Sequence, residues 1–503
     1  MKRLLFLSLF LGCGGSGVTI DVALDLPTKD VLSPYHPSAR LAYVRVTADG
    51  AERLDDVAKD IDLAARSVTF ESYPVSRLTR VQVQGYDALG TLVAFGQLDA
   101  QVDTDDLSLT IPFRRTLAYV THRDICDGGC AEGLVCANPG DGHRCVTPAA
   151  TGACGASCNA REQEVCALPA PMSGPACMRP YGGGARGAHV IYAIDVSSKT
   201  LVDVIDLPAA DQTAVNITAK GGAGVWVTLA SPGKSSAAFL SSATNTFAPS
   251  VDLPNGIEYV LGSPDTKYVA GGGGGNLYVF DETTGAEARK VPLGGRILDG
   301  VIGGGGSKAL FVTSAGLAQM DLEAPQEADP NSPGDVVGAS GVATSDDGRF
   351  AYVTSGADGR VFVFDLVAGG SLLFENRFLA TVRNMVFSAH AQIVLGIQVN
   401  APSQRVFAYS IDDRSGFPVD RGISILPEAR GIASGALGRR VVIVSAGTST
   451  GSSGLTVVDP VPDQEPTGST VLYPRDPTDS YLEGTVMSFQ RYRPDRVAIL
   501  NGQ

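Results

Sequence analysis

Eight cysteines between residues 126 and 177 form the densest group of chemically reactive side chains in the sequence. They fall into two quartets of similar spacing, C-x3-C-x5-C-x8-C and C-x3-C-x7-C-x10-C. The members are Cys126, Cys130, Cys136, Cys145, Cys154, Cys158, Cys166 and Cys177. Thiolate zinc sites commonly use C-x2-C pairs, which this stretch lacks. Because short segments rich in Gly, Ala and Pro cannot build their own core, an even set of cysteines predicts crosslinks instead. We expect four disulfides, two within each quartet, and no metal.

The ninth cysteine, Cys13, follows a short segment with the features of an export signal. The chain starts Met-Lys-Arg, and residues 4–11 are apolar except for Ser8, which matches the charged and apolar regions of a signal peptide. The sequence Phe-Leu-Gly-Cys at 10–13 resembles the lipobox of bacterial lipoproteins, whose cysteine becomes the lipidated first residue after cleavage. Ordinary cleavage, with Cys13 free or in a disulfide, is the alternative; the even number of other cysteines favours lipidation.

The lipobox resemblance implies a cellular location as well as a lipid modification. Residues 1–12 would be the signal peptide and 13–17 a tether, with Cys13 in the outer membrane and the protein facing the periplasm or the cell surface. The remaining sequence contains no run of ~18 apolar residues, the minimum for a membrane-spanning helix. We therefore expect the protein to contact the membrane only through the lipid attached to Cys13.

Composition indicates an all-β protein that does not bind nucleic acid. Glycine accounts for 60 of 503 residues, well above the usual ~7%, as expected for many short strands joined by tight turns. The net charge is −14, and no run of Lys or Arg could follow a phosphate backbone.

Residues 18–118 predict a β-sandwich. Val18, Ile20, Val22 and Leu24 alternate with more polar residues, which is the pattern of a strand with one buried face. Further strands are expected at 41–46, 67–73, 78–84, 91–97 and 107–113, and the number of short strands is typical of an immunoglobulin-like (Ig-like) domain. Residues 51–65 could form a short helix instead of a strand. Asp103, Asp105 and Asp106 are too few oxygens to predict a calcium site.

Residues 187–503 contain a repeat that is clearest at 342–366. There, two apolar runs, 350–353 and 361–364, each follow an Asp-Gly turn, which predicts a strand hairpin. Apolar segments equivalent to the second run end at residues 195, 241, 281, 321, 365, 412 and 459. Seven copies spaced by 40 to 47 residues are typical of a seven-bladed β-propeller with four strands per blade. The glycine runs at 271–275 and 303–306 are expected in hairpin turns, since no phosphate-loop lysine follows them.

The first repeat, beginning at His189, has only two strands, at 189–195 and 201–207. Two more strands are expected after the seventh repeat, at 485–489 and 496–500. We therefore predict that the ring is closed in the first blade by strands from both ends of the domain, which removes exposed sheet edges.

The repeat SDDGRFAYVTSGADGRVFVFDL, at 345–366, resembles the YVTN or lactonase-like family of seven-bladed propellers. Weaker copies occur at 263–285 and 437–459, and the resemblance covers residues 187–503. It implies the propeller fold and, for some family members, lactone hydrolysis. The cysteine-rich stretch, 124–180, resembles small EGF-like or Dickkopf-like modules, which implies spacing or protein contact.

No catalytic residues are predicted. The six aspartates that end repeat strands, from Asp195 to Asp459, are expected to accept backbone hydrogen bonds in Asx turns. His189 and His390 are the only histidines of the repeat region, and neither belongs to a nucleophile pattern. Trp226 is expected in the core. We therefore expect a non-enzymatic binding or scaffold protein, without cofactor, whose propeller contacts an envelope protein or glycan. A lactonase-like hydrolase acting at the central channel is the alternative.

Overall fold

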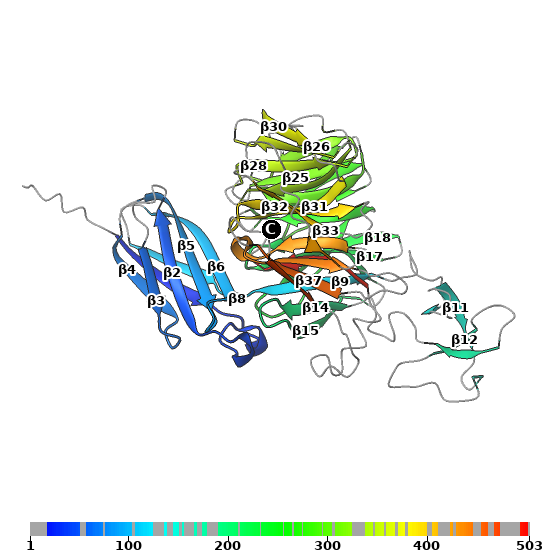
Figure 1. Cartoon of the computed structure of the whole chain (residues 1–503), viewed down its shortest axis with the longest axis horizontal. Helices are drawn as coiled ribbons and strands as arrows, with labels where there is room; N and C mark the ends of the chain where they lie inside the picture. The colour runs from blue at the N-terminus through cyan, green and yellow to red at the C-terminus, as the bar shows by residue number, and fades with distance from the viewer. Residues whose placement is uncertain are drawn as a thin grey trace, which may run out of the picture.

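The computed structural model describes most of residues 18–500, and nearly all of its regular structure is β-strand (Figure 1). Outside the described residues lie 1–17, 501–503, most of 124–189, and loops of which 324–335, 411–422 and 473–492 are the longest. Cys13 and the predicted signal peptide are therefore not described. In the described ranges, no helix is long and apolar enough to cross a membrane.

Two sheets near the N-terminus pack face to face around one core. One sheet has the order β4-β1-β7, and the other β3-β2-β5-β6-β8. Their strands are β1 (Val18–Asp25), β2 (Tyr43–Gly50), β3 (Val57–Ile61), β4 (Ser67–Tyr73), β5 (Ser76–Tyr86), β6 (Leu92–Val102), β7 (Leu107–Pro112) and β8 (Arg114–Arg115). The alternation predicted for β1 is confirmed, because Val18, Ile20, Val22 and Leu24 are buried in this core. The helix considered within 51–65 is wrong for Val57–Ile61, which forms β3.

The short connection after β1 contains two 3-10 turns, η1 (Asp30–Leu32) and η2 (Pro37–Ala39), and lies against the second domain. Leu32 joins a hydrophobic core made mostly by that domain. The two domains are therefore packed together at this point.

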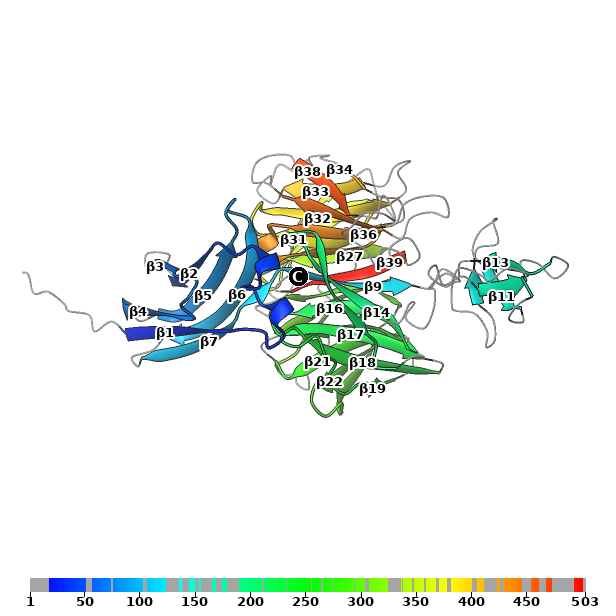
Figure 2. The same ribbon diagram turned by 90° about the horizontal axis from the view of Figure 1, so that it is seen from below.

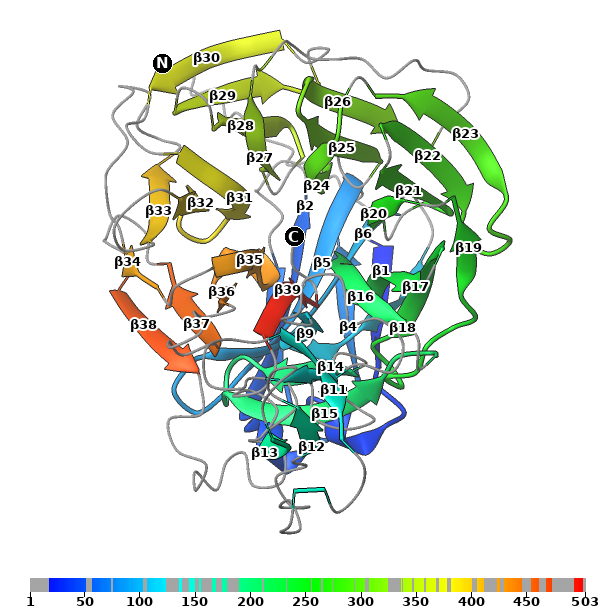
Figure 3. The same cartoon turned by 90° about the vertical axis from the view of Figure 1, so that its right-hand side faces the viewer.

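Seven antiparallel sheets follow in the described part of the chain, and together they form a propeller-type fold (Figure 3). From the inner strand outward, the first is β39 (Arg493–Ile499), β9 (Leu117–Arg123), β14 (Val190–Asp195) and β15 (Thr200–Asp206). The second is β16 (Thr213–Lys220), β17 (Gly224–Ser231), β18 (Lys234–Ser241) and β19 (Val251–Leu253). The third is β20 (Ile257–Gly262), β21 (Tyr268–Gly273), β22 (Asn276–Asp281) and β23 (Glu287–Pro292). The fourth is β24 (Ile297–Gly303), β25 (Lys308–Thr313) and β26 (Gly316–Asp321).

The remaining three sheets continue in chain order. The fifth is β27 (Ala339–Thr344), β28 (Phe350–Ser355), β29 (Arg360–Asp365) and β30 (Ser371–Arg377). The sixth is β31 (Thr381–Ser388), β32 (Ile393–Val399), β33 (Arg405–Ser410) and β34 (Ile423–Ser424). The seventh is β35 (Ala429–Ser434), β36 (Val441–Ser445), β37 (Gly454–Asp459) and β38 (Thr467–Leu472), with the turn η4 (Ala436–Gly438) after β35. The repeat that was clearest in the sequence thus forms the inner three strands of the fifth sheet.

The inner strands contact one another in sequence around the axis. Each of β16, β20, β24, β27, β31 and β35 contacts the next, and β39 contacts both β35 and β16. Apolar side chains from neighbouring sheets fill the space between them; for example, the rings of Tyr352 in the fifth sheet and Phe387 in the sixth stack with centroids 6.1 Å apart. This sheet-on-sheet packing is how a four-strand unit too small for its own core becomes stable.

The prediction for the first sheet needs one correction. Strands at 485–489 and 496–500 were expected to supply the inner pair together, and β39, which includes 496–499, occupies the innermost place. The second place, however, belongs to β9, which pairs with both β14 and β39. Residues 485–489, the other segment predicted for the inner pair, lie outside the described residues. The predicted boundary of the sandwich at residue 118 falls inside β9.

The reason is visible in the sequence of β9. Ala118–Thr121 reads AYVT, the same four residues as Ala351–Thr354 in the second strand of the fifth sheet. The first repeat therefore begins before the cysteine-rich stretch, which is inserted between the second and third strands of the first sheet. Figure 2 shows the consequence: the sandwich lies at one end of the propeller and β11 and β13 of the cysteine-rich stretch at the other.

The glycine run at 271–275 also differs from its prediction. Gly275 has a φ of +76° in a turn, as expected, but Gly271–Gly273 lie inside β21. A Cβ on Gly272 would come within 1.8 Å of Ile297 Cδ1 of the next sheet. Glycine is required there because the sheets approach each other closely, not because the chain turns.

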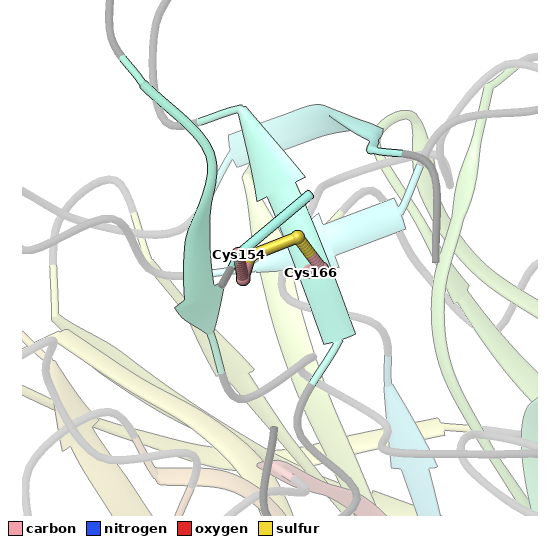
Figure 4. The surroundings of a disulfide bond; sticks show 2 residues. All are labelled: Cys154 and Cys166. Carbon is pink, nitrogen blue, oxygen red and sulfur yellow. A yellow bond between two sulfur atoms is a disulfide. The ribbon is translucent and has the colours of Figure 1, made fainter. Parts of the chain in front are cut away.

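The described cysteine-rich residues form two short hairpins. The strands β10 (Val135–Ala137) and β11 (Arg144–Pro148) pair, as do β12 (Val165–Leu168) and β13 (Ala176–Met178), and Cys136 opposes Cys145 as Cys166 opposes Cys177. This equivalence fits a duplication. Cys154 and Cys166 form a disulfide with Cα atoms 5.8 Å apart (Figure 4), and Cys177 is also disulfide-bonded. Pairing within the second quartet is thus confirmed for Cys154–Cys166, and disulfides at the other five cysteines stay a prediction.

Candidate ligand-binding site at the propeller axis

Two adjacent arginines on β8 attach the sandwich to the propeller. The side chain of Arg115 is fully buried, and its Nη2 lies 2.6 Å from Oδ2 of Asp195, which is equally buried at the end of β14. Arg115 also donates to the backbone oxygen of Val31, at 2.8 Å. Arg114 pairs with Asp25 of the sandwich and donates to the hydroxyl of Ser242, the residue after β18 of the second sheet. A buried charge needs its partner to be fixed in place, so these contacts hold the sandwich in one position on the propeller.

The sandwich lies over one end of the propeller axis, where an axial cavity of about 520 Å³ is present. Phe95, Leu98 and Pro112 of the sandwich line it on one side, and the inner strands of the propeller line the rest. Its wall is largely apolar, with Ile217, Leu261, Val301, Met385 and Phe387 among the propeller residues. Its volume is within the range of small-molecule sites, ~300–1,000 Å³.

Every inner strand has a register shift of the β-bulge kind within its first five residues. The pairing register with the second strand shifts at 214/216, 257/259, 297/299, 339/341, 383/385, 429/431 and 494/496. Bulges re-aim side chains and often occur beside functional sites. The residues that follow the bulges are Asn216, Tyr259, Asp299, Gly341, Met385, Gly431 and Arg496. We call this level of the axis the bulge ring, and the seven copies carry different residue types there.

Asp299, in the bulge ring, is the most strongly perturbed carboxyl group in the cavity. It accepts backbone hydrogen bonds from Gly300, at 3.0 Å, and from Val342 of the fifth sheet, at 3.2 Å. Burial raises the pKa of Asp299 to about 6, against the opposing effects of these N–H groups, Arg496 and the Met385 N–H. The carboxyl group therefore links three consecutive sheets, the fourth, fifth and sixth, and its pKa of about 6 allows its protonation to change near neutral pH.

Three arginines lie at or beside the bulges of three consecutive inner strands. Arg383 is on β31, Arg430 on β35 and Arg496 on β39. Arg383 donates to the Ala429 backbone oxygen at 2.9 Å, and Arg496 to the Arg430 backbone oxygen at 3.2 Å. Burial, together with the positive charges of Arg430 and Arg496, lowers the pKa of Arg383. These three arginines thus lie on consecutive inner strands on one side of the axis.

Asn216 continues this group of donors on the next inner strand. Its side chain is 5% exposed and lines the cavity, and its Nδ2 has no hydrogen-bond partner among the described residues. The Nε of Arg383 is likewise buried with no partner in the described part of the chain. Buried donors without partners are rare in proteins, because each one loses its hydration without compensation.

The cavity lacks a nucleophile with a base, as far as the described residues go. The hydroxyls of Thr218 and Thr344 donate to backbone oxygens, at 2.6 and 3.2 Å, and that of Ser434 to a backbone oxygen at 3.3 Å. No histidine lines the cavity. His390 lies instead in the turn between β31 and β32, beside Arg439, where burial lowers its pKa. His189 is outside the described residues.

The other residues singled out from the sequence have structural contacts. Asp281 accepts from the backbone N–H groups of Thr283 and Thr284, and Asp365 from Val367, as predicted for Asx turns. Trp226 is 4% exposed in the core between the second and third sheets. Asp412 is not described. Among the residues whose placement is described, no cluster of three or more metal-ligating side chains occurs.

Sequence reasoning missed Arg115, Asp299, the three arginines and Asn216. A signal existed for Arg115, because Arg349 of the fifth sheet also stands shortly before AYVT, one residue nearer than Arg115 does, and pairs with Asp365 at 3.0 Å. Arg440 and Asp459 repeat the same pairing in the seventh sheet, at 3.1 Å. For the bulge ring, aligning the seven inner strands would have shown which positions differ.

Comparisons with known proteins do not assign a family. No protein-family model matches the chain, and no curated protein matches it. Similar solved structures include the hydrazine synthase of Kuenenia stuttgartiensis, with 16% identity, a TM-score of 0.40, and coverage of 49% of this chain and 76% of that one. A chain of a mitotic checkpoint complex has 11% identity and a TM-score of 0.41, covering 51% and 78%. These scores are too low to support a functional argument, and the propeller-type fold rests on the sheet topology itself.

Proposed function

We propose that this chain is a non-enzymatic lipoprotein of the bacterial cell envelope, anchored through Cys13, which binds an envelope protein or glycan through its propeller. The observation that carries the proposal is the chemistry of the axis: the walls are largely apolar, and the hydroxyls of Thr218, Thr344 and Ser434 donate to backbone oxygens. Such a lining suits binding, because nucleophilic catalysis needs a hydroxyl or thiol beside a positioned base.

The proposal includes a finer description of the architecture. We interpret the seven sheets as the blades of a closed propeller of the YVTN or lactonase-like type, a reading supported by the contacts of β39 with both β35 and β16. The sandwich, taken as Ig-like, follows the tether and serves as a stalk. The cysteine-rich module projects from the hairpin of the first blade at the other end of the propeller.

The binding face in this proposal is the end of the axis away from the sandwich. Leu298, at the start of β24, is an apolar side chain with 40% exposure. Beside it, the exposed pair Arg296 and Glu258 lies with Nη2 and Oε2 3.0 Å apart. An exposed apolar residue bordered by charged ones is typical of a protein contact surface.

Two experiments test the proposal. Mass spectrometry of the mature protein should find an acylated N-terminus at Cys13; an unacylated N-terminus at another residue would contradict the anchor. A photocrosslinking amino acid at Leu298 should capture an envelope component in intact cells, whereas the same group at Leu89, which is 90% exposed on the sandwich, should not. Crosslinks at Leu89 alone would contradict binding through the propeller.

One observation favours the hydrolase as a second candidate. Asp299 lies in the cavity with a pKa raised by burial to about 6, which is suitable for a general acid or base at neutral pH. This candidate requires lactone turnover by the purified protein that Asp299→Asn abolishes. If the protein turned over neither short nor long acyl lactones, the hydrolase candidate would be rejected and only the binding role would remain.

A further inference from the structure

A second cavity, of about 230 Å³, lies between the sandwich and the propeller, and we call it the interdomain cavity. The sandwich contributes the turn between β5 and β6, and the propeller contributes η4, the residues that follow it, and the turn after β31. Its volume greatly exceeds the ~10–15 Å³ that a single water needs. Domain interfaces are a common place for small-molecule sites.

The side chain of Arg439, which follows η4, spans the two domains at this cavity. The carbon of its guanidinium group lies 5.9 Å from the centroid of the Tyr86 ring in the sandwich, and that ring stacks on Tyr43 with centroids 5.0 Å apart. No hydrogen bond or ion pair joins this side chain to the described residues, and its Nε is buried. The aromatic ring therefore holds in place a guanidinium group whose hydrogen-bonding capacity is unused.

The ionisable groups in the wall of the interdomain cavity are Arg439, Arg440, Asp459 and His390. Arg440 and Asp459 neutralise each other, since Nε and Oδ1 are 3.1 Å apart. Burial, together with the positive charge of Arg439, lowers the pKa of His390, so the imidazole ring is neutral at pH 7. The wall therefore carries one uncompensated positive charge, which belongs to Arg439.

The charged groups next to the wall cancel among the described residues. Lys199 lies within electrostatic reach of Arg440 and Asp459 on the propeller side. Asp87 lies in the sandwich turn, where it accepts from the backbone N–H groups of Leu89 and Thr91. The remaining neighbours are ion pairs, Arg45 with Asp60 and Arg115 with Asp195. The single positive charge of the wall therefore remains after its surroundings are counted.

The hydroxyl of Thr116 is a second group of the wall without a partner. Thr116 is 5% exposed, and its Oγ1 has no hydrogen-bond partner among the described residues. Its backbone is fixed, because its N–H donates to Val93 and its oxygen accepts from Val196, both at 3.1 Å. A buried hydroxyl in this state gains stability when a ligand oxygen accepts its proton.

We propose that the interdomain cavity binds a small aliphatic monocarboxylate, whose carboxylate pairs with Arg439. The planar guanidinium group can donate two parallel hydrogen bonds to a carboxylate. A monoanion is favoured over a dianion, because the wall has one uncompensated positive charge and also contains the Asp459 carboxylate. The carbon chain of the ligand contacts the apolar part of the wall, formed by Leu92, Ala436 and Pro460.

This site is separate from the binding face proposed above. His390 follows β31, so the interdomain cavity lies at the ends of the inner strands, whereas Leu298 lies at the start of β24. The two proposals depend on different residues and can fail independently. Loss of carboxylate binding leaves crosslinking at Leu298 unchanged.

Titration of the full-length chain with butyrate, butyramide and inorganic phosphate tests the proposal, with the imidazole resonance of His390 as the reporter. The chain has five histidines, and His390→Gln assigns the signal. Butyrate should raise the pKa of His390 by about half a unit or more, because its negative charge offsets that of Arg439. It should also bind roughly tenfold more tightly than butyramide, its neutral isostere.

Three outcomes of this titration would overturn the proposal. Equal binding of butyramide would remove the role of the charge. Tighter binding of phosphate at His390 would replace the carboxylate by another class of anion. Butyrate without effect on the pKa of His390 would remove the ligand from this cavity.

Variants locate the binding. Arg439→Gln should weaken butyrate binding roughly fivefold or more, and should raise the pKa of His390 in the ligand-free protein. Arg439→Lys, which keeps the charge without the planar fork, should bind with intermediate affinity. Arg296→Gln, a substitution of an arginine whose side chain is 73% exposed, is the control and should change the affinity less than about twofold.

Thermal unfolding separates binding from a structural role of Arg439. Butyrate should raise the unfolding temperature of the unmodified protein, because the ligand binds only the folded state, and should not raise that of Arg439→Gln. A lower unfolding temperature of Arg439→Gln with unchanged butyrate affinity would assign Arg439 to domain packing and contradict the proposal.

Discussion

The first and fifth sheets of the propeller have the same strand order but very different connections. The fifth sheet is one continuous segment, 339–377, whereas the first combines β9, β14 with β15, and β39 from three separate parts of the chain. Both contain AYVT in the second strand and an Arg–Asp pair beside it. The difference lies in burial: Arg115 is fully buried beneath the sandwich, and Arg349 is 54% exposed.

This comparison teaches that the repeat specifies a strand arrangement without specifying its connections. The fifth sheet pairs residues close in sequence, so ordering it costs little loop-closure entropy. The first sheet must bring together residues more than 300 positions apart, for example Val120 and Val497. The stability of the first sheet should therefore depend more strongly on each of its contacts than the stability of the fifth sheet does.

Removal of β39 should have the largest effect. Deleting 484–503 removes Val497, Ile499 and Leu500, which are buried in two cores on either side of the first sheet. At about 1.5–3 kcal/mol for each large apolar side chain, the loss is on the order of 5 kcal/mol or more. We expect a large decrease in unfolding temperature and self-association through the exposed edge, measured by calorimetry and gel filtration. Deleting only 501–503 is the control; a longer deletion that remained monomeric and equally heat-stable would refute ring closure by β39.

The second-largest effect is expected from replacing the equivalent aspartates of the first and fifth sheets, and the loss of stability should differ between the two. Asp195→Asn leaves the buried Arg115 without a carboxylate, which typically costs ~3–5 kcal/mol. Asp365→Asn leaves Arg349 largely in water, so about 1 kcal/mol is expected. Free energies of unfolding in urea provide the measurement. Equal losses in the two variants would show that burial beneath the sandwich does not distinguish the sheets.

Asp299 connects the contiguous sheets to the closing strand, because it faces Arg496 of β39 as well as Val342 of the fifth sheet. Its folded-state pKa is raised by burial to about 6 from 3.8, so the folded protein holds this proton more tightly than the unfolded chain. The contribution is most favourable below pH 3.8 and is lost as the pH rises through about 6, by roughly 3 kcal/mol in total.

The corresponding test is the free energy of unfolding measured from pH 4 to 7.5, with and without Asp299→Asn. The substitution should flatten the decrease between pH 4 and 6. Asp99→Asn, which alters a cavity carboxylate already paired with Arg80 on the sandwich, is the matched control. An unchanged pH profile in Asp299→Asn would contradict the assignment of this titration to the axis.

Replacing the cysteine-rich insertion should have the smallest effect. Val120 pairs with Tyr192, so β9 and β14 can be joined directly by a four-residue turn in place of 124–188. Shortening the connection reduces its closure entropy by ~0.6 kcal/mol for each halving of length, so stability should be unchanged or raised by up to about 2 kcal/mol. Thermal unfolding is the measurement. A marked decrease would mean that the insertion stabilises the first sheet.

Much of the fold was predictable, and the limits have physical causes. Apolar alternation located β1, and the repeat located the third strand of all seven sheets, because strand periodicity is local. The assignment of β9 failed because the search used segments ending in Asp, while AYVT at 118–121 stood alone before the insertion. The bulge ring was not predictable from any one segment, since Asn216, Asp299 and Arg496 are far apart in the chain and have no common motif.

The sequence by itself determined the strand units, their number, the Asx turns at their ends and the cysteine duplication, because each depends on neighbouring residues. The tertiary structure decided three further features: the origin of the first sheet, the burial of Arg115 with Asp195, and the donors collected around the axis. These features arise only when sheets pack around a centre, since that packing brings distant side chains to one level and removes them from water.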